Sequence, residues 1–215
     1  TLFRSEHLRG LVDYCLGQFP GPLPPADAPG RDEPAVVLLN QAVERLADLA
    51  ASYMVAGFVH GVLNSDNMAI TGESFDYGPW RFLPRWDPAF TAAYFDQNGL
   101  YAFGRQPEAI RWNLGQLAIA LRPLVEPEPL IAALDRYGEC YQAAMVRRFC
   151  WRLGVANRGM EHDVALIERA EQEMREGKIG PETWFHRERG GTDEPVTMLI
   201  DEVEDIWAAI AEREI

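Results

Sequence analysis

Residues 60–78 read HGVLNSDNMAITGESFDYG and place two aspartates and an asparagine, Asp66, Asn67 and Asp76, around a short apolar run. No lysine or arginine lies within the stretch to balance the two acids. The chain as a whole is already acidic, with 20 Lys and Arg against 33 Asp and Glu and a formal net charge of −13. The gathering of further acids here therefore raises the hypothesis of a functional site.

The centre of this stretch has the pattern of a β-hairpin. Thr71-Gly72 suits a two-residue turn, because glycine adopts positive φ without steric cost. With that turn, residues 68–70 pair with residues 73–75, and Asn67 lies directly opposite Asp76. Directly opposed residues of antiparallel strands have Cα atoms roughly 4.5–5.5 Å apart and side chains on the same face. We therefore expect Asn67 and Asp76 to meet at the open end of the hairpin.

The residue types at that end suit a hard divalent cation. One carboxylate and one amide oxygen on a short element can hold Mg²⁺, which keeps its other positions for water and phosphate oxygens. Asp66 points away from Asn67 if the backbone is extended there, and a carboxylate beside a metal–phosphate site can accept a proton from an attacking hydroxyl. The structural alternative is that Asn67 and Asp76 cap a turn and Asp66 is solvated, since Asp and Asn concentrate in turns.

Length and composition predict a globular chain of one or two domains, since it has 215 residues and 47% hydrophobic residues. The negative charge argues against binding to nucleic acid through a basic surface. No apolar run approaches the ~20 residues of a membrane span, and no basic segment precedes an apolar one as in a signal peptide. We therefore expect a cytoplasmic protein that binds neither nucleic acid nor membrane.

The three cysteines, Cys15, Cys140 and Cys150, are odd in number and lack CxxC spacing. This pattern predicts small core residues rather than a disulfide framework or a zinc site. The first five residues, TLFRS, match the translation of a common sequencing-library adaptor. We expect residues 1–5 to be a non-native leader and leave them out of the fold prediction.

Apolar residues recur at helical spacing along most of the chain. The expected helices cover residues 6–19, 34–56, 107–121, 128–153, 161–176 and 196–213, the last of them acidic and amphipathic. Proline interrupts the pattern in a loop at residues 20–34, and an aromatic segment with several prolines follows the hairpin at residues 79–107. The predicted fold class is α+β, predominantly helical, with one short hairpin that carries the metal-binding residues.

A longer pattern surrounds the hairpin. The stretch GFVHGVLNSDNMAITGESFDYGP, residues 57–79, is followed by YAFGRQPEAIRWNLGQLAIAL, residues 101–121. In order and spacing the two stretches resemble the selenoprotein O (SelO) family of protein adenylyltransferases, which has a protein-kinase-like fold. The resemblance is specific over residues 36–122 and weaker as far as residue 187. It implies a kinase-like C-terminal lobe over residues 6–195, followed by the acidic helix within residues 196–215.

By this resemblance Asp66 would be the catalytic proton acceptor. Asn67 and Asp76 would be the Mg²⁺ ligands, and Asp76 would also contact ATP through the metal. Asp76, Tyr77 and Gly78 look like the counterpart of the kinase Asp-Phe-Gly motif. In ordinary kinases, however, the catalytic Asp precedes the metal-binding Asn by several residues. Here the two residues are adjacent, which separates this chain from phosphorylating kinases.

The family is understood to bind ATP in a flipped orientation and to transfer AMP to Ser, Thr or Tyr hydroxyls of proteins. The resemblance therefore implies Mg²⁺ and ATP as cofactors and proteins bearing hydroxyl side chains as partners. The family's N-terminal lobe, with a Gly-rich loop, a Lys–Glu ion pair and phosphate-binding arginines, is missing. We expect a C-terminal lobe with little or no transferase activity alone. Two alternatives stay open: a kinase-like phosphotransferase using the same three residues, and a non-catalytic binding module in the manner of a pseudokinase.

Several neighbouring residues have structural interpretations. His60 is expected to be structural, as its counterpart is in kinase folds. Gln106, Trp112 and Asn113 belong to the second family-like stretch and are expected to support the catalytic loop. The aromatic residues of segment 79–107 could line a groove for a protein substrate, but core packing is the favoured role for most of them. They are Trp80, Phe82, Trp86, Phe90, Tyr94, Phe95, Tyr101 and Phe103.

Overall fold

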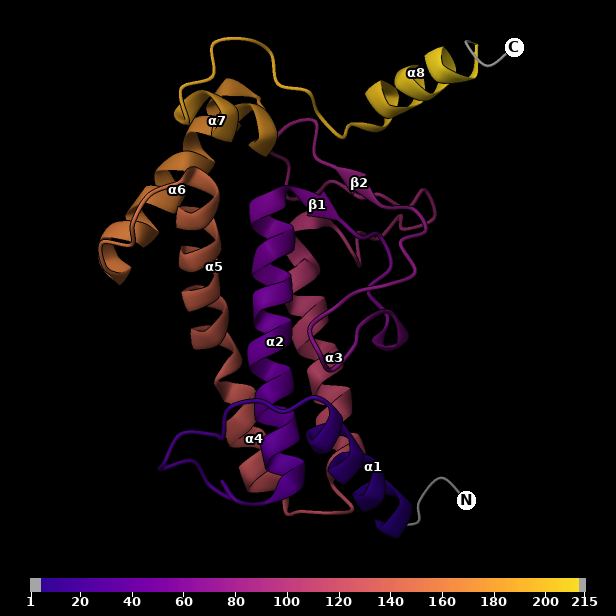
Figure 1. The fold of residues 1–215 in the computed structure, drawn as a ribbon, viewed down its shortest axis with the longest axis vertical. Helices are drawn as coiled ribbons and strands as arrows, with labels where there is room; N and C mark the ends of the chain where they lie inside the picture. The colour runs from indigo at the N-terminus through magenta and orange to yellow at the C-terminus, as the bar shows by residue number, and fades with distance from the viewer. Residues whose placement is uncertain (1–4, 213–215) are drawn as a thin grey trace. The chain divides into compact units, whose positions relative to one another are not determined.

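The computed structural model describes residues 5–212, which are predominantly helical with one small antiparallel sheet (Figure 1). This confirms the predicted α+β composition. The described residues divide into two compact units. The first unit comprises residues 5–51, 63–76 and 107–144, and the second comprises residues 52–62, 77–106 and 145–212. Of the expected leader, residues 1–4 lie outside the described residues, and Ser5 is the first residue of a helix.

Five helices contribute to the first unit. They are α1 (Ser5–Gln18), α2 (Pro34–Ala56), α3 (Gln106–Leu121), α4 (Pro127–Asp135) and α5 (Tyr137–Leu153). The last turn of α2, the first residue of α3 and the second half of α5 belong to the second unit. The limits of α1, α2 and α3 agree with the predicted ones within one residue, because each has a strong helical period and a proline or glycine close to an end.

Helix α2 illustrates why the sequence folds in this way. Pro34 occupies its first position, where the missing N–H has no helical acceptor to lose. Gly57 follows its last residue with φ of 67°, a left-handed conformation that ends helices and favours glycine. Between these limits, Val36, Leu39 and Val43 share one face and are fully buried. The helix therefore presents a continuous apolar face to the core of the first unit.

The single helix predicted over residues 128–153 is wrong, because two helices occupy this range. α4 ends at Asp135 and α5 begins at Tyr137, with Arg136 between them. Arg136 donates to the side chains of Asn40 and, at 2.9 Å, Glu44 of α2, and the Tyr137 hydroxyl donates to the Pro107 carbonyl at 2.9 Å. The residues at the break are thus held by distant partners, which local periodicity does not reveal.

The second unit contains the regular sheet found among residues 5–212. Strand β1 (Phe58–Val59) is antiparallel to β2 (Arg81–Phe82), with Phe58 opposite Phe82 and Val59 opposite Arg81. The predicted strands at residues 68–70 and 73–75 contribute only an isolated bridge. The prediction that the strands of the fold are residues 68–70 and 73–75 is therefore wrong. The paired strands β1 and β2 come before and after that segment in the chain.

Helices α6 (Met160–Gly177) and α7 (Pro181–Glu188) pack with the second half of α5 around a cluster of aromatic rings. The Trp184 ring centroid lies 5.6 Å from that of Phe149 and 5.0 Å from that of Phe185. Trp184 also donates its indole N–H to Glu173 at 2.9 Å. These contacts make Trp184, which is 3% exposed, the centre of this core.

The final helices differ from prediction at identifiable positions. Helix α7 was missed, although Pro181 at its first position and the apolar pair Trp184-Phe185 are sequence signals for it. The last helix, α8 (Ile200–Ala211), begins four residues later than predicted. The Thr197 hydroxyl accepts the Leu199 N–H at 3.2 Å, and Glu202 accepts the Thr197 N–H at 3.2 Å. These local bonds hold the residues before Ile200 outside the helix.

The aromatic segment divides between the two expected roles. Phe103 is fully buried, and its ring lies 5.3 Å from that of Trp86, which confirms core packing for this pair. Tyr94 and Phe95 are 93% and 56% exposed, so core packing is wrong for them. The other four side chains, Trp80, Phe82, Phe90 and Tyr101, are partly buried.

The remaining expectations from composition concern membranes and cysteines. Among the helices of the described chain, none combines the length and apolarity needed to cross a bilayer. The three cysteines are free thiols, but only Cys150 is buried in a core cluster, while Cys15 and Cys140 are half-buried. Burial raises the pKa of the Cys140 and Cys150 thiols, with Asp163 contributing at Cys150. Raised pKa values make these two thiols poor nucleophiles at neutral pH.

Candidate functional site

The turn that joins Asn67 to Asp76 has a different register from the predicted one. Met68 bridges Ser74, the Ala69 N–H donates to the Glu73 carbonyl at 2.8 Å, and the Phe75 N–H donates to the Asn67 carbonyl at 3.3 Å. Asn67 is therefore opposite Phe75 and not Asp76. The predicted register is wrong by one residue, because the loop contains three residues, 70–72, instead of two.

Gly72 closes the three-residue loop and contacts Arg45. Its φ of 83° is the left-handed conformation that closes three-residue hairpin loops. A Cβ atom added at Gly72 would lie 3.0 Å from both the Cβ and the carbonyl oxygen of Arg45. The Arg45 guanidinium in turn donates to the Ile70 carbonyl at 3.3 Å. Arg45, which the sequence did not mark as important, thus holds the loop against α2.

Asp76 follows the paired residues with an unusual backbone conformation. Its φ is 56°, and with Lys178 it is one of two described non-glycine residues with positive φ. Lys178 is the cap of α6, where left-handed residues are common, whereas Asp76 caps no helix. Asp tolerates this conformation better than most residues, yet it is sparsely populated. In a regular strand, a register shift of one residue would place Asp76 on the opposite face from Asn67. The backbone of Asp76 is left-handed and not extended, so this alternation of faces does not apply to its carboxylate.

Asp66 and Asn67 lie in the short 3₁₀ helix η1 (Ser65–Asn67). The expectation of an extended backbone at Asp66 is therefore wrong. Successive side chains of a 3₁₀ helix still diverge, by about 120° for its three residues per turn. Asp66 is exposed, whereas Asn67 is 5% exposed. The two adjacent side chains have different environments, as predicted, but a helical turn and not a strand produces the difference.

The donor set fits Mg²⁺ better than a transition metal. Within residues 5–212, no three His, Cys, Asp or Glu side chains gather as a metal cluster, so a zinc-type site is not indicated there. Mg²⁺ is commonly held by one or two carboxylates together with water and substrate phosphates. Asp76 supplies one carboxylate and Asn67 one amide oxygen on neighbouring positions of one loop. These two residues could hold the ion only if water or phosphate supplied the other ligands.

Two amides of α3 fix the backbone that leads into this loop. In the second unit, Gln106 accepts the His60 N–H at 3.0 Å and donates to the Phe58 carbonyl at 2.9 Å. In the first unit, Asn113 donates to the Leu63 carbonyl at 2.8 Å. The expected supporting role of Gln106 and Asn113 is confirmed. Trp112 is 63% exposed, so no such packing role is evident for it.

His60 has the surroundings of a structural residue. Its side chain is fully buried, its Nδ1 accepts the Val62 N–H at 3.4 Å, and its ring lies 5.5 Å from that of Tyr77. A fully buried imidazole has no route to an attacking substrate. The burial and contacts of His60 therefore agree with its expected structural role.

Replacing Gln106 by alanine is expected to lower the free energy of unfolding by about 2–3 kcal/mol, because two buried backbone groups lose a partner. Gln106→Glu is the matched comparison, since an ionised carboxylate can accept from His60 but cannot donate to the Phe58 carbonyl. It should lose at least as much stability as Gln106→Ala at neutral pH, because the fully buried carboxylate also loses its hydration. Urea unfolding followed by circular dichroism measures both variants, and equal stability of Gln106→Ala and the unchanged chain would contradict the supporting role.

Comparisons with known proteins bear directly on this site. The family model described as Protein adenylyltransferase SelO matches residues 1–205. The chain belongs to the SelO family. The segment with Asp66, Asn67 and Asp76 lies inside the match, so the SelO-family assignment covers the candidate site. The resemblance inferred from residues 57–79 and 101–121 is thereby confirmed.

Curated relatives of this SelO-family chain are named protein nucleotidyltransferase YdiU. The Synechocystis relative is 38% identical over 178 residues, covering 82% of this chain and 35% of the relative. The Hahella chejuensis relative is 41% identical over 160 residues, covering 74% and 31%. The Pseudomonas putida relative is 35% identical over 209 residues, covering 97% and 41%. The aligned part of the SelO-family chain thus spans between 31% and 41% of these relatives.

Proposed function

We propose that this SelO-family chain provides the catalytic lobe, kinase-like in fold, of an enzyme that transfers AMP from ATP to Ser, Thr or Tyr hydroxyls of proteins. The observation that carries the proposal is the loop of residues 66–76. It combines an exposed carboxylate, a buried amide and an aspartate in strained left-handed backbone inside the family match. Strained backbone in a polar loop is a feature of functional sites.

In the proposed reaction Asp66 is the general base. Its exposed carboxylate accepts the proton of the substrate hydroxyl while the hydroxyl oxygen bonds to the α-phosphorus of ATP and pyrophosphate leaves. Asn67 and Asp76 would hold Mg²⁺, which when bound neutralises charge on the phosphate oxygens. Asn67 is buried, and the hydrogen bonds from Ser74 and Phe75 to its backbone carbonyl hold its backbone in place before substrate arrives. We place the reaction in the cytoplasm, where ATP is available.

We also propose that the 215-residue chain is inactive by itself. Its one lysine, Lys178, is the left-handed cap of α6 and lies outside the segment of residues 66–76. The family's Lys–Glu ion pair would therefore have to come from residues outside this sequence. In support, the chain aligns with less than half of its relatives' length. Incorporation of AMP into protein by the isolated chain would contradict this proposal.

The decisive experiment uses a chimera in which residues 5–205 replace the matching segment of the Pseudomonas putida relative. Incubation with ATP labelled on the α-phosphate should label acceptor proteins, because the AMP moiety is transferred. ATP labelled on the γ-phosphate should leave them unlabelled. Omitting Mg²⁺ in the presence of EDTA should abolish the signal. Labelling by γ-phosphate alone would instead favour the kinase-like phosphotransferase.

The non-catalytic binding module is tested in the same chimera. It predicts no transfer from either label and no effect of Asp76→Ala on the chimera's binding partners. A folded chimera, shown by circular dichroism and a cooperative thermal transition, is needed for that result to count. Transfer from the α-label, lost on substitution of Asp76, would exclude the module.

A further inference from the structure

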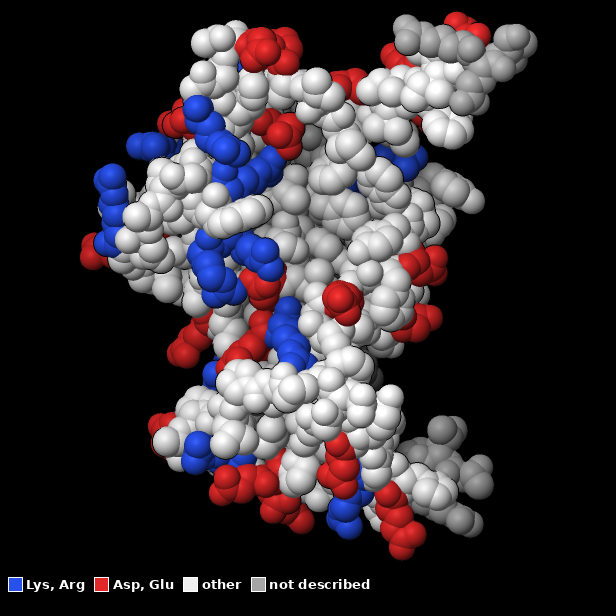
Figure 2. Space-filling view, in the orientation of Figure 1, with Lys and Arg blue, Asp and Glu red and all other residues white. Residues whose placement is uncertain are grey.

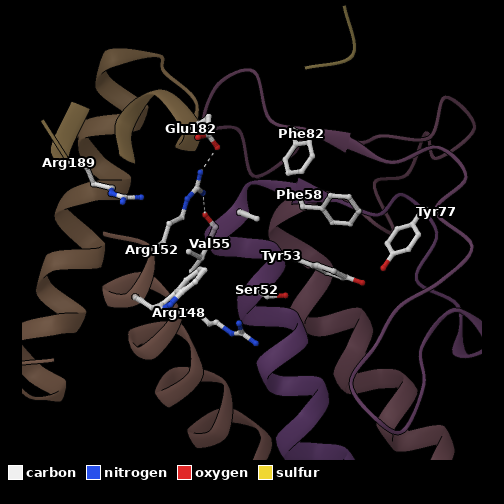
Figure 3. A pocket seen from close by; sticks show the side chains of 12 residues that line it. Ser52, Tyr53, Val55, Phe58, Tyr77, Phe82, Arg148, Arg152, Glu182 and Arg189 are labelled. Carbon is white, nitrogen blue, oxygen red and sulfur yellow. Dashed lines mark hydrogen bonds and ion pairs between the residues drawn. The ribbon is translucent and has the colours of Figure 1, made fainter. Parts of the chain in front are cut away.

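The second unit contains a cavity that the proposed reaction does not use. Its volume of about 780 Å³ falls within the range of small-molecule sites, roughly 300–1,000 Å³. The last turn of α2, the two strands, α5 and α7 all contribute to its lining. Figure 3 shows the side chains that face it. Asp66, Asn67 and Asp76 are absent from the lining.

One side of the cavity is cationic. Arg148 and Arg152 come from α5, four residues apart and therefore on one face of the helix, and Arg189 follows the last residue of α7 (Figure 3). Glu182 is the one acidic residue in the lining. Figure 2 shows basic side chains gathered over α5 and α7 on this face. In a chain of net charge −13, this local excess of positive charge calls for a specific explanation.

Arg152 is the fixed member of the cationic side. It donates to the Val55 carbonyl and to Glu182 at 2.5 Å, and its guanidinium carbon lies 4.2 Å from the centre of the Phe185 ring. Its side chain is 17% exposed. Burial lowers the pKa of Arg152, Glu182 raises it, and the like charge of Arg189 lowers it again. An anion in the cavity would offset both the lost hydration and the repulsion between arginines.

The other side of the cavity is aromatic. Phe58, Phe82 and Tyr77 line it, and Figure 3 shows their rings on the side away from the arginines. The Phe58 ring lies 5.4 Å from that of Phe82 and 6.0 Å from that of Tyr77. Phe58 thus contacts both of the other rings. Such a wall offers surface for an offset-stacked or edge-to-face contact with another flat ring.

We propose that this cavity binds a small molecule that contains both an aromatic ring and a phosphate group. The phosphate would lie against Arg148 and Arg189, with Arg152 behind them, and the ring against Phe58 and Phe82. Arginine favours phosphate because its planar fork donates two parallel hydrogen bonds. The shared chemistry is a phosphate group joined to a flat ring system, directly in aryl phosphates and through ribose in nucleoside monophosphates. The ligand proposal does not depend on the proposed function.

Calorimetric titration of the 215-residue chain tests this site, with EDTA present to exclude metal-dependent binding at residues 66–76. Phenyl phosphate should bind about tenfold more tightly than inorganic phosphate or phenol, since only it engages both walls. AMP is the second aromatic phosphate tested. Tighter binding of AMP would assign nucleoside monophosphates as the ligand class, and tighter binding of phenyl phosphate would assign aryl phosphates. Failure of both to bind would overturn the proposal.

Variants locate the binding. Arg189→Gln should weaken phenyl phosphate binding about tenfold through the loss of a charged hydrogen bond. Phe82→Leu should weaken binding of phenyl phosphate but not of inorganic phosphate. Arg169→Gln is the matched control, because Arg169 is 59% exposed on α6 and does not line the cavity. Asp66→Ala should leave binding unchanged, because Asp66 is exposed and does not line the cavity. A strong effect of Asp66→Ala, or none of Arg189→Gln in a variant that unfolds cooperatively, would show that the ligand binds elsewhere.

Discussion

Asp76→Ala in the Pseudomonas putida chimera is expected to reduce AMP transfer by at least about 10²-fold, because the proposed Mg²⁺ site loses its carboxylate and the phosphate charge is no longer neutralised. The same substitution in the 215-residue chain should weaken binding of Mn²⁺, a paramagnetic substitute for Mg²⁺ that can be followed by electron paramagnetic resonance. The two measurements together connect the left-handed aspartate with metal binding and with catalysis.

Asp66→Ala is the matched control for this prediction. A general base contributes roughly 10²–10⁴-fold to a rate, so AMP transfer should also fall by that order. Mn²⁺ binding should be retained, because Asp66 is exposed and is not a proposed ligand. The roles assigned to Asp66 and Asp76 would be wrong if the two variants lost Mn²⁺ binding equally, or if both retained full activity in a folded chimera.

Trp184→Ala is expected to lower the free energy of unfolding by about 3–5 kcal/mol, the usual range when a buried tryptophan is truncated. Trp184 is 3% exposed and packs among Phe149, Phe185 and their neighbours in the second unit. The substitution also leaves the Glu173 carboxylate without its indole donor. Chemical unfolding followed by tryptophan fluorescence and circular dichroism measures the effect.

The same substitution in α8 provides the comparison. Trp207 is 72% exposed, and none of the residues of Ile200–Ala211 is buried. Trp207→Ala should therefore change stability by no more than about 0.5 kcal/mol. A loss at Trp207 as large as that at Trp184 would mean that α8 packs against a surface in solution, and the description of α8 as exposed would be wrong.

Local sequence signals were sufficient for α1, α2, α3 and α6. Pro34 and Gly57 delimit α2 because each restricts or permits a particular backbone angle regardless of the rest of the chain. The break at Arg136 could not be predicted in that way. It is held by hydrogen bonds to α2 and to Pro107, residues 30 to 96 positions away in the sequence.

In the candidate site, too, some features follow from the local sequence and others depend on contacts between distant residues. The identity of Asp66, Asn67 and Asp76, and the family to which the chain belongs, follow from the order of residues in one stretch. The register of the loop does not, because Gly72 permits both a two-residue and a three-residue loop. Close contact between Gly72 and Arg45 accompanies the three-residue form, and the sequence gives no sign that those residues touch.

The sequence by itself therefore determined which chemical groups this protein brings to residues 60–78 and that helices precede and follow them in the chain. Only the tertiary structure decided that Asp66 lies in a 3₁₀ turn, that Asn67 is opposite Phe75, and that three arginines share a cavity with an aromatic wall. The physical reason is the distance along the chain over which each effect acts. Backbone preferences act over a few residues, whereas loop register and cavity lining depend on contacts between residues far apart in the chain.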